Sequence, residues 1–391
     1  MKRIEVVFFD AGGGHRSAAN ALKHVIEQQN RDWEVKLVNL QELLAPLDIF
    51  RKVTGVSAEN VYNEVLKRGW TLGSPQVARV MQTIIRFYHP RQVALLEKHW
   101  VATRPDLLVS LIPNFNRALH QSLKHSMPGT PMVTILTDMA DYPPHFWMEQ
   151  QEQGFICGTE RAVAQAHSLG HEPSRVFRTS GMILNPRFYD FVSLDRRAER
   201  ARLGLNPDLP TGLVLFGGHG SGVMYRIAER LGKAGLKVQL ILLCGHNAKL
   251  AARLRALKTS MPVHVEDFTR EVPRFMSLAD FFIGKPGPGS ISEALAMKLP
   301  VIVERNAWTM PQERYNTEWV REQGAGLVLK SFRDIVGAVQ ELLEPSNYER
   351  FRSAAAAQAN RAVFEIPDML EKLLNGCGEM PAQAAARARK N

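Results

Sequence analysis

Apolar runs and amphipathic stretches alternate along the chain. Ile4–Phe9 predicts a buried strand, the glycine-rich turn Asp10–His15 follows, and Ser17–Gln28 repeats apolar or small residues at helical spacing. Trp33–Leu40 predicts the next strand. A strand, a glycine turn, a helix and a second strand are the opening units of a doubly wound parallel sheet.

Two series of such units are predicted. Further strands of the first series are expected at Leu107–Leu111, Met132–Thr137, Gly154–Cys157 and Val176–Thr179. The second series follows the turn-rich boundary Asn206–Pro210. Its strands are expected at Leu213–Phe216, Lys237–Leu243, Val263–Glu266, Phe281–Ile283, Pro300–Val303 and Gly326–Leu329. We therefore expect an α/β fold of two facing Rossmann-like domains, with a ligand site in the cleft beyond the carboxyl ends of the strands.

Length and composition fit this picture. A chain of 391 residues is too long for one compact core, and 45% hydrophobic with 23% charged residues is typical of a soluble globular protein. The cysteines match no metal or disulfide spacing, which suits a reducing compartment; they are Cys157, Cys244 and Cys377. No apolar stretch approaches the roughly 18 residues of a transmembrane helix, and the first apolar run is too short for a signal-peptide core.

The formal net charge of +10 favours an anionic partner such as nucleic acid, anionic lipid or a phosphate-rich substrate, although a basic protein can simply be soluble. Residues 49–100 hold many basic side chains, namely Arg51, Lys52, Lys67, Arg68, Arg79, Arg86, Arg91 and Lys98. Aromatic residues lie between them, namely Tyr62, Trp70, Phe87, Tyr88 and Trp100. This mixture suits an anionic bilayer, and it could also serve RNA or a solvated face. Nothing in the chain resembles a nucleic-acid-binding module, so we expect no nucleic acid.

Two glycine-rich turns of the second series each join a predicted strand to a predicted helix. They are Gly217–Gly222 and Gly284–Ser290. Glycine lets the backbone approach a phosphate, while free N–H groups and the helix dipole face it. Each turn could be merely structural, but two in one domain predict a diphosphate held between them.

Polar side chains near these turns predict further ligand contacts. Glu293 is expected in the first turn of the helix that follows the second glycine turn, where a carboxylate can accept both hydroxyls of a ribose or balance the helix dipole. Gln312 and Glu313, with Asn316, are expected in a polar loop after the strand Pro300–Val303. An adjacent amide and carboxylate can hold several sugar hydroxyls at once.

Two residues of the first series are candidates for proton transfer. His15 ends the first glycine turn, from which a neutral imidazole could take a proton from a hydroxyl, and the helix start would lower its pKa. It could also merely cap the helix. Asp138 closes the strand Met132–Thr137 and could orient His15, act as the base or cap a turn. Asp138 and Asp141 alone do not make a convincing metal site, so no metal is expected.

The order of the motifs resembles that of a known family. The motifs are Gly12–Arg16, Gly217–Gly218, Cys244–Asn247, Glu266–Phe268, Ala279–Asp280, Gly284–Ala294 and Gln312–Glu313. Over about residues 4–345 this order resembles the monogalactosyldiacylglycerol synthase and processive diacylglycerol glucosyltransferase family, which is related to the MurG-type glycosyltransferases.

The resemblance implies a GT-B fold, a UDP-sugar donor and inversion at the anomeric carbon without a metal or other cofactor. By matched position, His15 would be the base, with Gly13 and Gly14 beside it on the acceptor side. Phe268 would lie near the uracil and Glu293 at the ribose. The implied donor-binding residues are Gly217, Gly218, Asn247, Phe268, Gly287, Gly289, Ser290, Glu293, Gln312 and Glu313.

The resemblance also implies an organisation and a reaction. Residues 1–205 would bind the acceptor, with 49–100 facing it or the membrane, and 206–345 would bind the UDP-sugar. Residues 346–376 would cross back as helices, and 377–391 would be a disordered basic tail. The enzyme would move a hexose to a lipid hydroxyl, that of diacylglycerol in this family, while bound peripherally to the cytoplasmic face of a membrane.

Two features depart from the family's pattern. Asn306–Met310 contains no glycine before Gln312, and Asp141–Pro144 is unusual on the acceptor side. The alternatives are a transferase with a soluble or another lipid acceptor, and a UDP-sugar 2-epimerase, which would need acidic residues on both faces of the cleft. A non-enzymatic alternative is a nucleic-acid-binding protein, which the charge of +10 suggests.

Overall fold

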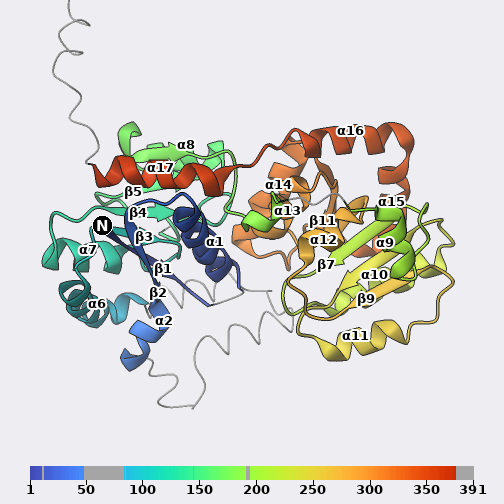
Figure 1. Cartoon of the computed structure of the whole chain (residues 1–391), viewed down its shortest axis with the longest axis horizontal. Coiled ribbons are helices and arrows are strands. Elements are labelled where there is room, and N and C mark those ends of the chain that lie inside the picture. The colour runs from blue at the N-terminus through green and yellow to red at the C-terminus, as the bar shows by residue number, and fades with distance from the viewer. Residues whose placement is uncertain (11–12, 48–82, 84, 144, 191–193, 376–391) are drawn as a thin grey trace, which may run out of the picture.

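The computed structural model describes residues 1–10, 13–47, 83, 85–143, 145–190 and 194–375. In it, two sheets of six strands each lie side by side (Figure 1). The N-terminal half of the chain forms one sheet and the C-terminal half forms the other, and every strand pair is parallel. The expected α/β fold of two Rossmann-like units is confirmed.

The first sheet has the strand order β2-β1-β3-β4-β5-β6. Its strands are β1 (Lys2–Phe8), β2 (Trp33–Asn39), β3 (Leu107–Ser110), β4 (Met132–Ile135), β5 (Gly154–Cys157) and β6 (Val176–Arg178). The helices described in this half are α1 (Gly14–Gln28), α2 (Leu40–Leu43), α6 (His89–Thr103), α7 (Asn116–Ser126) and α8 (Glu160–Ser168). Short 3-10 helices lie at η1 (Ala45–Leu47), η2 (Pro173–Arg175) and η3 (Pro186–Phe188).

The second sheet has the strand order β12-β11-β10-β7-β8-β9. Its strands are β7 (Thr211–Leu215), β8 (Gln239–Leu243), β9 (Val263–Glu266), β10 (Phe281–Gly284), β11 (Val301–Glu304) and β12 (Gly326–Leu329). Its helices are α9 (Arg196–Arg202), α10 (Gly222–Lys233), α11 (Ala248–Arg255), α12 (Val272–Ser277), α13 (Pro288–Ala296), α14 (Arg314–Glu322) and α15 (Ile335–Leu343), with 3-10 helices η4 (Pro311–Glu313) and η5 (Phe332–Asp334). This order is that of a dinucleotide-binding Rossmann sheet.

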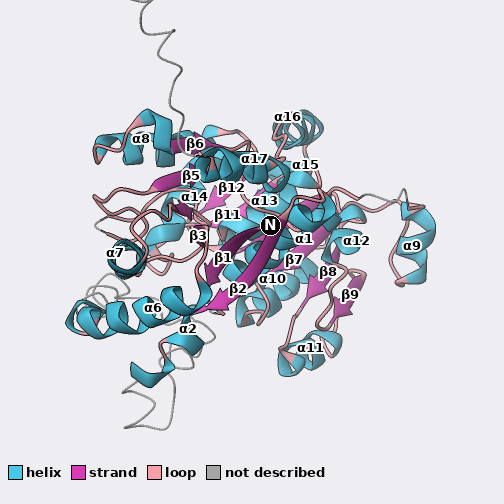
Figure 2. Ribbon diagram, turned by 60° about the vertical axis from the view of Figure 1, so that its left-hand side comes forward, coloured by secondary structure: helices cyan, strands magenta, loops and turns pink. Residues whose placement is uncertain are grey.

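Helices cover both faces of each sheet (Figure 2). In the first half, α1 packs on one face, and α6 and α7 pack on the other. In the second half, α12, α13 and α14 cover one face while α10, α11 and α15 cover the other. Strands buried on both faces read as nearly continuous apolar runs, which is why all the expected strands are found, with boundaries within two residues of the prediction.

The last two helices connect the halves. α16 (Pro345–Ala356) packs on the second half through Phe351 and Ala355. The chain then crosses to the first half, where α17 (Ala362–Leu374) packs against α1 through Ile366 and Leu370 (Figure 1). The two halves are therefore joined twice, once between β6 and α9 and once between α16 and α17.

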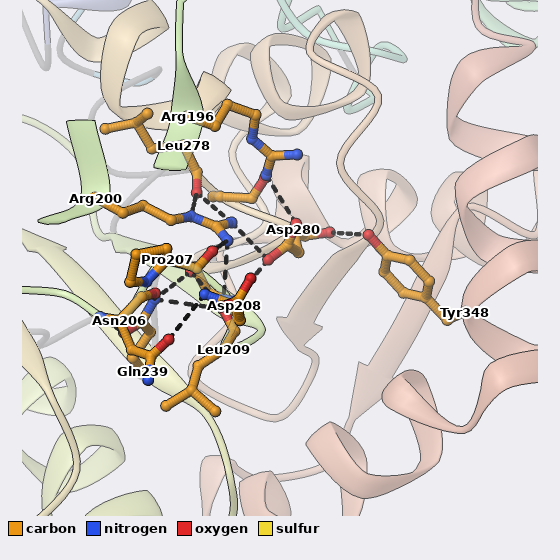
Figure 3. A network of polar contacts seen from close by, with 12 residues as sticks. Arg196, Arg200, Asn206, Pro207, Asp208, Leu209, Gln239, Leu278, Asp280 and Tyr348 are labelled. Carbon is orange, nitrogen blue, oxygen red and sulfur yellow. Dashed lines mark hydrogen bonds and ion pairs between the residues drawn. The ribbon is translucent and has the colours of Figure 1, made fainter. Parts of the chain in front are cut away.

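A buried polar network closes the amino ends of β7, β8 and β10 (Figure 3). Arg200 is only 6% exposed, and its guanidinium donates to the Leu278 carbonyl at 2.7 and 2.9 Å and to Asp280 Oδ2 at 2.7 Å. Asp280 also accepts hydrogen bonds from the Thr211 amide and from Arg196, both at 2.8 Å. A buried ion pair is tolerated because its remaining donors and acceptors are satisfied.

One local expectation is wrong. Glu293 lies in the second turn of α13, because the helix already begins at Pro288, with Gly287 as its N-cap. Proline is favoured at the first helical position, since its fixed φ suits a helix and its missing N–H is not needed there. Most of the 49–100 segment and the tail 377–391 lie outside the described residues.

Candidate active site between the two sheets

The two glycine turns and His15 lie where the strand order of each sheet reverses. In the second sheet, β7 pairs with β10, and the remaining strands lie to either side of this pair. In the first sheet, β1 and β3 are the corresponding neighbours. Ligands of doubly wound sheets bind outside the carboxyl ends of the strands at this point. The loops after β7 and β10 are the two glycine turns, and His15 follows β1.

The loop after β7 is shaped as an anion-binding turn. Gly217 has a φ of +72°, a left-handed conformation that favours glycine. Gly220 donates its amide to the Gly217 carbonyl at 3.1 Å, and no heavy atom outside the neighbouring residues lies within 4 Å of the place where a Cβ on Gly218 would be. The hydroxyl of Ser221 then caps α10 by accepting the Val223 amide at 3.3 Å. The turn therefore ends at a helix N-terminus, where free N–H groups favour negative charge.

The loop after β10 is held by its neighbours. Gly287 donates its amide to the Lys285 carbonyl at 2.8 Å, and the Ser290 hydroxyl donates to the Gly287 carbonyl at 3.2 Å. Asn316 is fully buried and donates its Nδ2 to the Pro286 carbonyl at 2.8 Å. Asn316 lies in α14 and not in the polar loop in which it was expected, so it positions this glycine turn from behind.

Lys285 stands between the two glycine turns. Its Cε lies 3.6 Å from the place where a Cβ on Gly217 would be and 3.4 Å from the corresponding place on Gly287. Its Nζ lies 3.3 Å from Glu313 Oε1. A half-exposed cation therefore lies at the point where a diphosphate was expected. The sequence patterns did not single out Lys285, although a lysine within a glycine turn between a strand and a helix is a known phosphate-binding signal.

The loops after β8 and β9 form a flat aromatic surface. The rings of His246 and Phe268 are stacked with centroids 3.9 Å apart, and Phe268 is 50% exposed. Gly245 has a φ of +58°, and a Cβ there would collide with the Gly218 carbonyl, so only glycine lets this loop approach the β7 loop. Asn247 donates to the His219 carbonyl at 3.2 Å and accepts the Leu250 amide at 3.0 Å. Its side chain shapes the loop and caps α11.

The expected sugar-binding pair follows β11. Gln312 and Glu313 lie in η4, with Glu313 buried and Gln312 partly exposed. Glu313 Oε1 lies 3.7 Å from the place where a Cβ on Gly287 would be. Gly217, Lys285, Gly287, Ser290 and Glu313 are therefore brought together, while Gly289 has open space beside its Cα. Phe268 lies on the opposite side of β7, after the edge strand β9.

Glu293 lies one turn beyond Ser290 on α13, so both side chains project from the same face of that helix. It is partly buried, and this burial raises the pKa of its carboxyl group to about 7. A carboxyl group whose pKa is raised to near neutral pH destabilises the folded protein, and such groups are typical of functional sites.

His15 lies in the first turn of α1, directly after Gly13, which caps the helix, and Gly14. Its Nδ1 lies 3.1 Å from the Thr137 hydroxyl, and its ring centroid lies 6.0 Å from that of Trp147. Burial lowers the pKa of His15 to about 4, while a hydrogen bond with the Leu111 carbonyl opposes this shift. The lowered pKa was expected, but burial is its main cause. His15 is therefore neutral near pH 7.

Asp138 accepts a hydrogen bond from Trp147, whose ring lies beside that of His15. Its Oδ2 accepts the Trp147 indole N–H at 2.8 Å, and the hydroxyl that contacts His15 belongs to the adjacent Thr137. Burial raises the pKa of Asp138 to about 7, and the carboxylate of Glu313 raises it further while Lys285 lowers it. Because Glu313 and Lys285 belong to the second half, the two sets of site residues face each other across the cleft.

Asp141 is tied to the same tryptophan. Its Oδ1 accepts the Trp147 backbone amide at 2.8 Å, and burial raises its pKa to about 6. The two aspartates thus hold different atoms of Trp147. Across the described parts of the chain, no group of three histidine, cysteine or acidic side chains could hold a metal ion.

Comparisons with known proteins agree with this geometry. The model of the glycosyltransferase family 28 C-terminal domain matches residues 213–372. The protein is a glycosyltransferase. Monogalactosyldiacylglycerol synthase of Spinacia oleracea is 28% identical over 393 residues, covering 95% of this chain and 73% of the relative. The synthase 1 of Arabidopsis thaliana is 26% identical over 400 residues, covering 97% and 72%.

Solved structures show the same fold for this glycosyltransferase. A Staphylococcus aureus MnaA–UDP structure aligns with a TM-score of 0.64 at 14% identity, covering 96% of this chain and 97% of the other. MurG of Acinetobacter baumannii aligns with a TM-score of 0.61 at 13% identity, covering 95% and 100%. The resemblance that the motifs predict, to the galactolipid synthases and to MurG-type GT-B enzymes, is confirmed.

Proposed function

We propose that this glycosyltransferase moves a hexose from a UDP-sugar to the hydroxyl of a lipid acceptor, diacylglycerol, with inversion at the anomeric carbon. The observation that carries this proposal is the meeting of two unlike sets of groups across one cleft. Two glycine turns with Lys285 lie on one side, and His15 with Asp138 lies on the other. The first set suits a diphosphate leaving group, and the second suits proton transfer.

The donor would lie along the carboxyl edge of the second sheet. The exposed face of Phe268, supported from beneath by His246, suits a uracil ring. Glu293 would accept the ribose hydroxyls, and the turns at Gly217–Gly218 and Gly287–Ser290 would hold the diphosphate. Gln312 and Glu313 would hold the hexose, which leaves its anomeric carbon toward the first half.

The reaction needs one proton acceptor and one stabilised leaving group. The lipid hydroxyl would attack the anomeric carbon, the bond to the diphosphate oxygen would break, and the hydroxyl proton would pass to neutral His15. Negative charge grows on the departing UDP, where Lys285 and the backbone N–H groups of the two turns would stabilise it. These groups would do the work that a metal ion does in other transferases, so we propose that no metal is required.

Relatives and surface features support the acceptor. The named relatives make monogalactosyldiacylglycerol, a glycolipid. No helix among the described residues is long and apolar enough to cross a membrane. The exposed Phe87 and the basic Arg86 precede α6, and Arg91 lies in its first turn. These side chains would contact an anionic membrane from its cytoplasmic side. Residues 1–205 would then be the acceptor domain and 206–345 the donor domain.

The test measures UDP release from a panel of UDP-hexoses, with and without anionic vesicles that contain diacylglycerol. Release that needs one particular donor together with the diacylglycerol vesicles supports the proposal and identifies the hexose. Vesicles of the same charge without diacylglycerol are the control. Turnover that is indifferent to diacylglycerol removes the lipid acceptor, and no binding of any UDP-sugar removes the donor as well.

One observation favours a second candidate, a UDP-sugar 2-epimerase. Each half contributes an acidic side chain to the cleft, since burial raises the pKa of Asp138 of the first half and the nearby carboxylate of Glu313 of the second half adds to this rise. Such an enzyme would interconvert two UDP-sugars with no acceptor present. Incubation of the protein with single UDP-N-acetylhexosamines, followed by separation of the epimers, distinguishes the two reactions.

A further inference from the structure

A cavity of about 260 Å³ lies between the two halves, behind the cleft that holds the proposed active site. Its walls come from the loop between β5 and α8, from the connection after β6, from α13 and α14, and from the crossing between α16 and α17. Figure 1 shows this crossing where the last helices pass from one half to the other. The cavity therefore lies at the junction of the two halves, which we call the hinge, and has walls from both of them.

The cavity is separate from the proposed donor site. Ser290 and Glu293 project from one face of α13, and Ser292 and Leu295, which line the cavity, project from the opposite face. On the first half, Met139 lines the cavity and directly follows Asp138 in the chain. One helix and one loop thus carry active-site groups on one side and cavity walls on the other.

One face of α14 supplies a stripe of cavity residues. Tyr315, Trp319 and Gln323 all line the cavity, and each lies four residues after the last. Residues at this spacing lie one above another on a helix. Two aromatic side chains followed by an amide can stack on a ring and hydrogen-bond its edge.

Polar groups at the cavity lack protein partners. Gln358 donates its Nε2 to Gln323 Oε1 at 3.1 Å, which leaves Gln323 Nε2 and Gln358 Oε1 unbonded within the described chain. Ser292 is only 7% exposed, and no described residue hydrogen-bonds its hydroxyl. Gln323 and Gln358 are only partly buried, so water reaches these groups when the cavity is empty, and a ligand with donors and acceptors of its own can replace that water.

The charges around the cavity cancel. Arg178 Nε lies 3.0 Å from Glu160 Oε1. Arg161 lies over the Tyr315 ring at 4.9 Å, and the Glu322 carboxylate lies near the Tyr315 hydroxyl. Two cations and two carboxylates leave no net charge to attract a phosphate or an ammonium group, so the site favours a neutral ligand.

We propose that this hinge cavity binds one neutral, polyhydroxylated ring, a free hexose, as a second ligand site. Its aromatic stripe stacks on the ring, and Ser292, Gln323 and Gln358 exchange hydrogen bonds with the hydroxyls. Because both halves contribute walls, a bound hexose favours one arrangement of the halves over others and so couples to the cleft. This site does not depend on the identity of the proposed donor or acceptor.

The test is saturation-transfer-difference NMR with glucose, galactose and N-acetylglucosamine on the full-length protein, with excess UDP present to occupy the proposed donor site. The wild-type protein is expected to bind at least one of the three sugars at millimolar concentration. Trp319→Leu should weaken this binding about tenfold by removing the stacking surface. Gln358→Ala should weaken it about fivefold by removing one hydrogen-bonding group.

Trp308→Leu is the matched control, because Trp308 is 50% exposed and lies outside the cavity. Its affinity should equal that of the wild type. Thermal unfolding shows whether each variant is folded. If Trp319→Leu does not fold, sugar binding by Gln358→Ala tests the proposal. The proposal is overturned if the wild type binds none of the three sugars, or if binding is unchanged in the folded cavity variants.

Discussion

The two ends of the second sheet are built in opposite ways. At the amino ends of β7, β8 and β10, Arg200 and Asp280 form a buried pair whose hydrogen-bonding groups meet backbone and side-chain partners (Figure 3). At the carboxyl ends, Glu293 carries a carboxyl group with a raised pKa, and Asn316 Oδ1 is buried without a partner among the described residues. The same strands thus connect an end whose buried polar groups all have hydrogen-bond partners to an end where some of them lack partners.

This difference shows where stability and function lie. Fully partnered buried charges stabilise a fold only while both partners are present. Buried groups that lack hydrogen-bond partners, or whose pKa burial shifts toward neutral pH, destabilise the free protein. They contribute to function when a bound ligand supplies the missing partner. Substitutions at the amino ends should therefore affect folding, and substitutions at the carboxyl ends should affect turnover.

The largest effect is expected at the amino end. Arg200→Ala leaves Asp280 buried without its main counter-charge, which should lower the stability of the second half by about 3–5 kcal/mol. The melting temperature measures this loss. Arg197→Ala on the same helix removes only the exposed pair with Asp208, and it should cost less than about 1 kcal/mol. Equal losses for the two variants would contradict a structural role for the network.

Lys285→Ala should have the largest effect on turnover. Loss of the cation between the glycine turns should lower kcat roughly 100- to 1,000-fold, since such groups act on charge that develops in the transition state. Lys249→Ala, on the exposed surface of α11, is the control and should leave kcat unchanged. A Lys285→Ala enzyme with normal kcat would mean that the backbone turns alone stabilise the leaving group.

His15→Ala should lower the rate by about 100-fold or more if His15 takes the acceptor proton. The melting temperature should change little, because His15 is only partly buried and is not part of the hydrophobic core that α1 forms with the sheet. His24→Ala on the same helix is the matched control, since His24 is exposed. Wild-type turnover in a folded His15→Ala variant would move the role of base to Asp138.

The pH profile separates these two candidates for the base. The pKa of His15 is lowered to about 4, so a His15 mechanism should reach full kcat by about pH 5 and stay flat to neutrality. The pKa of Asp138 is raised to about 7, so an Asp138 mechanism should gain rate as the pH rises through 7. The profile is measured at saturating donor, so that the ionisation of Glu293 affects binding and not kcat.

The smallest effect is expected for Glu293→Gln. A carboxyl group whose pKa is raised from 4.5 to about 7 destabilises the folded protein once the pH exceeds 4.5, and increasingly so up to about 7. The variant should therefore be more stable by about 1–2 kcal/mol at pH 8, less than the full shift implies because the side chain is partly exposed. The gain should vanish below pH 4.5. Donor KM should rise, and an unchanged KM would remove Glu293 from the ribose.

Much of the fold follows from local sequence alone. Each strand is a short, nearly continuous apolar run, because a strand buried on both faces needs no alternation. The sequence also predicts the two glycine turns, because a strand, a turn and a helix in succession restrict the positions at which glycine is needed. Helix boundaries follow less directly from the local sequence. Helix α13 begins earlier than expected, at Pro288, and Glu293 therefore lies in its second turn.

The chemistry of the site depended on contacts between distant segments. Lys285 became a candidate only when Gly217, 68 residues earlier, was seen beside it. The sequence left open whether Asp138 orients His15, acts as the base or caps a turn; in the structure its carboxylate accepts a hydrogen bond from Trp147, and burial, with a contribution from Glu313 in the other half, raises its pKa. Asn316 was expected in a loop and instead supports the β10 turn from α14. No local pattern encodes these pairings.

The sequence by itself therefore determined the α/β class, the order of the strands along the chain and the residues at their carboxyl ends, because apolar periodicity and turn chemistry act over a few residues. Only the tertiary structure decided which of those ends meet, which carboxyl groups lose water and shift in pKa, and that a cavity forms at the hinge. These properties arise from burial and proximity between segments far apart in the chain, and local sequence does not specify either.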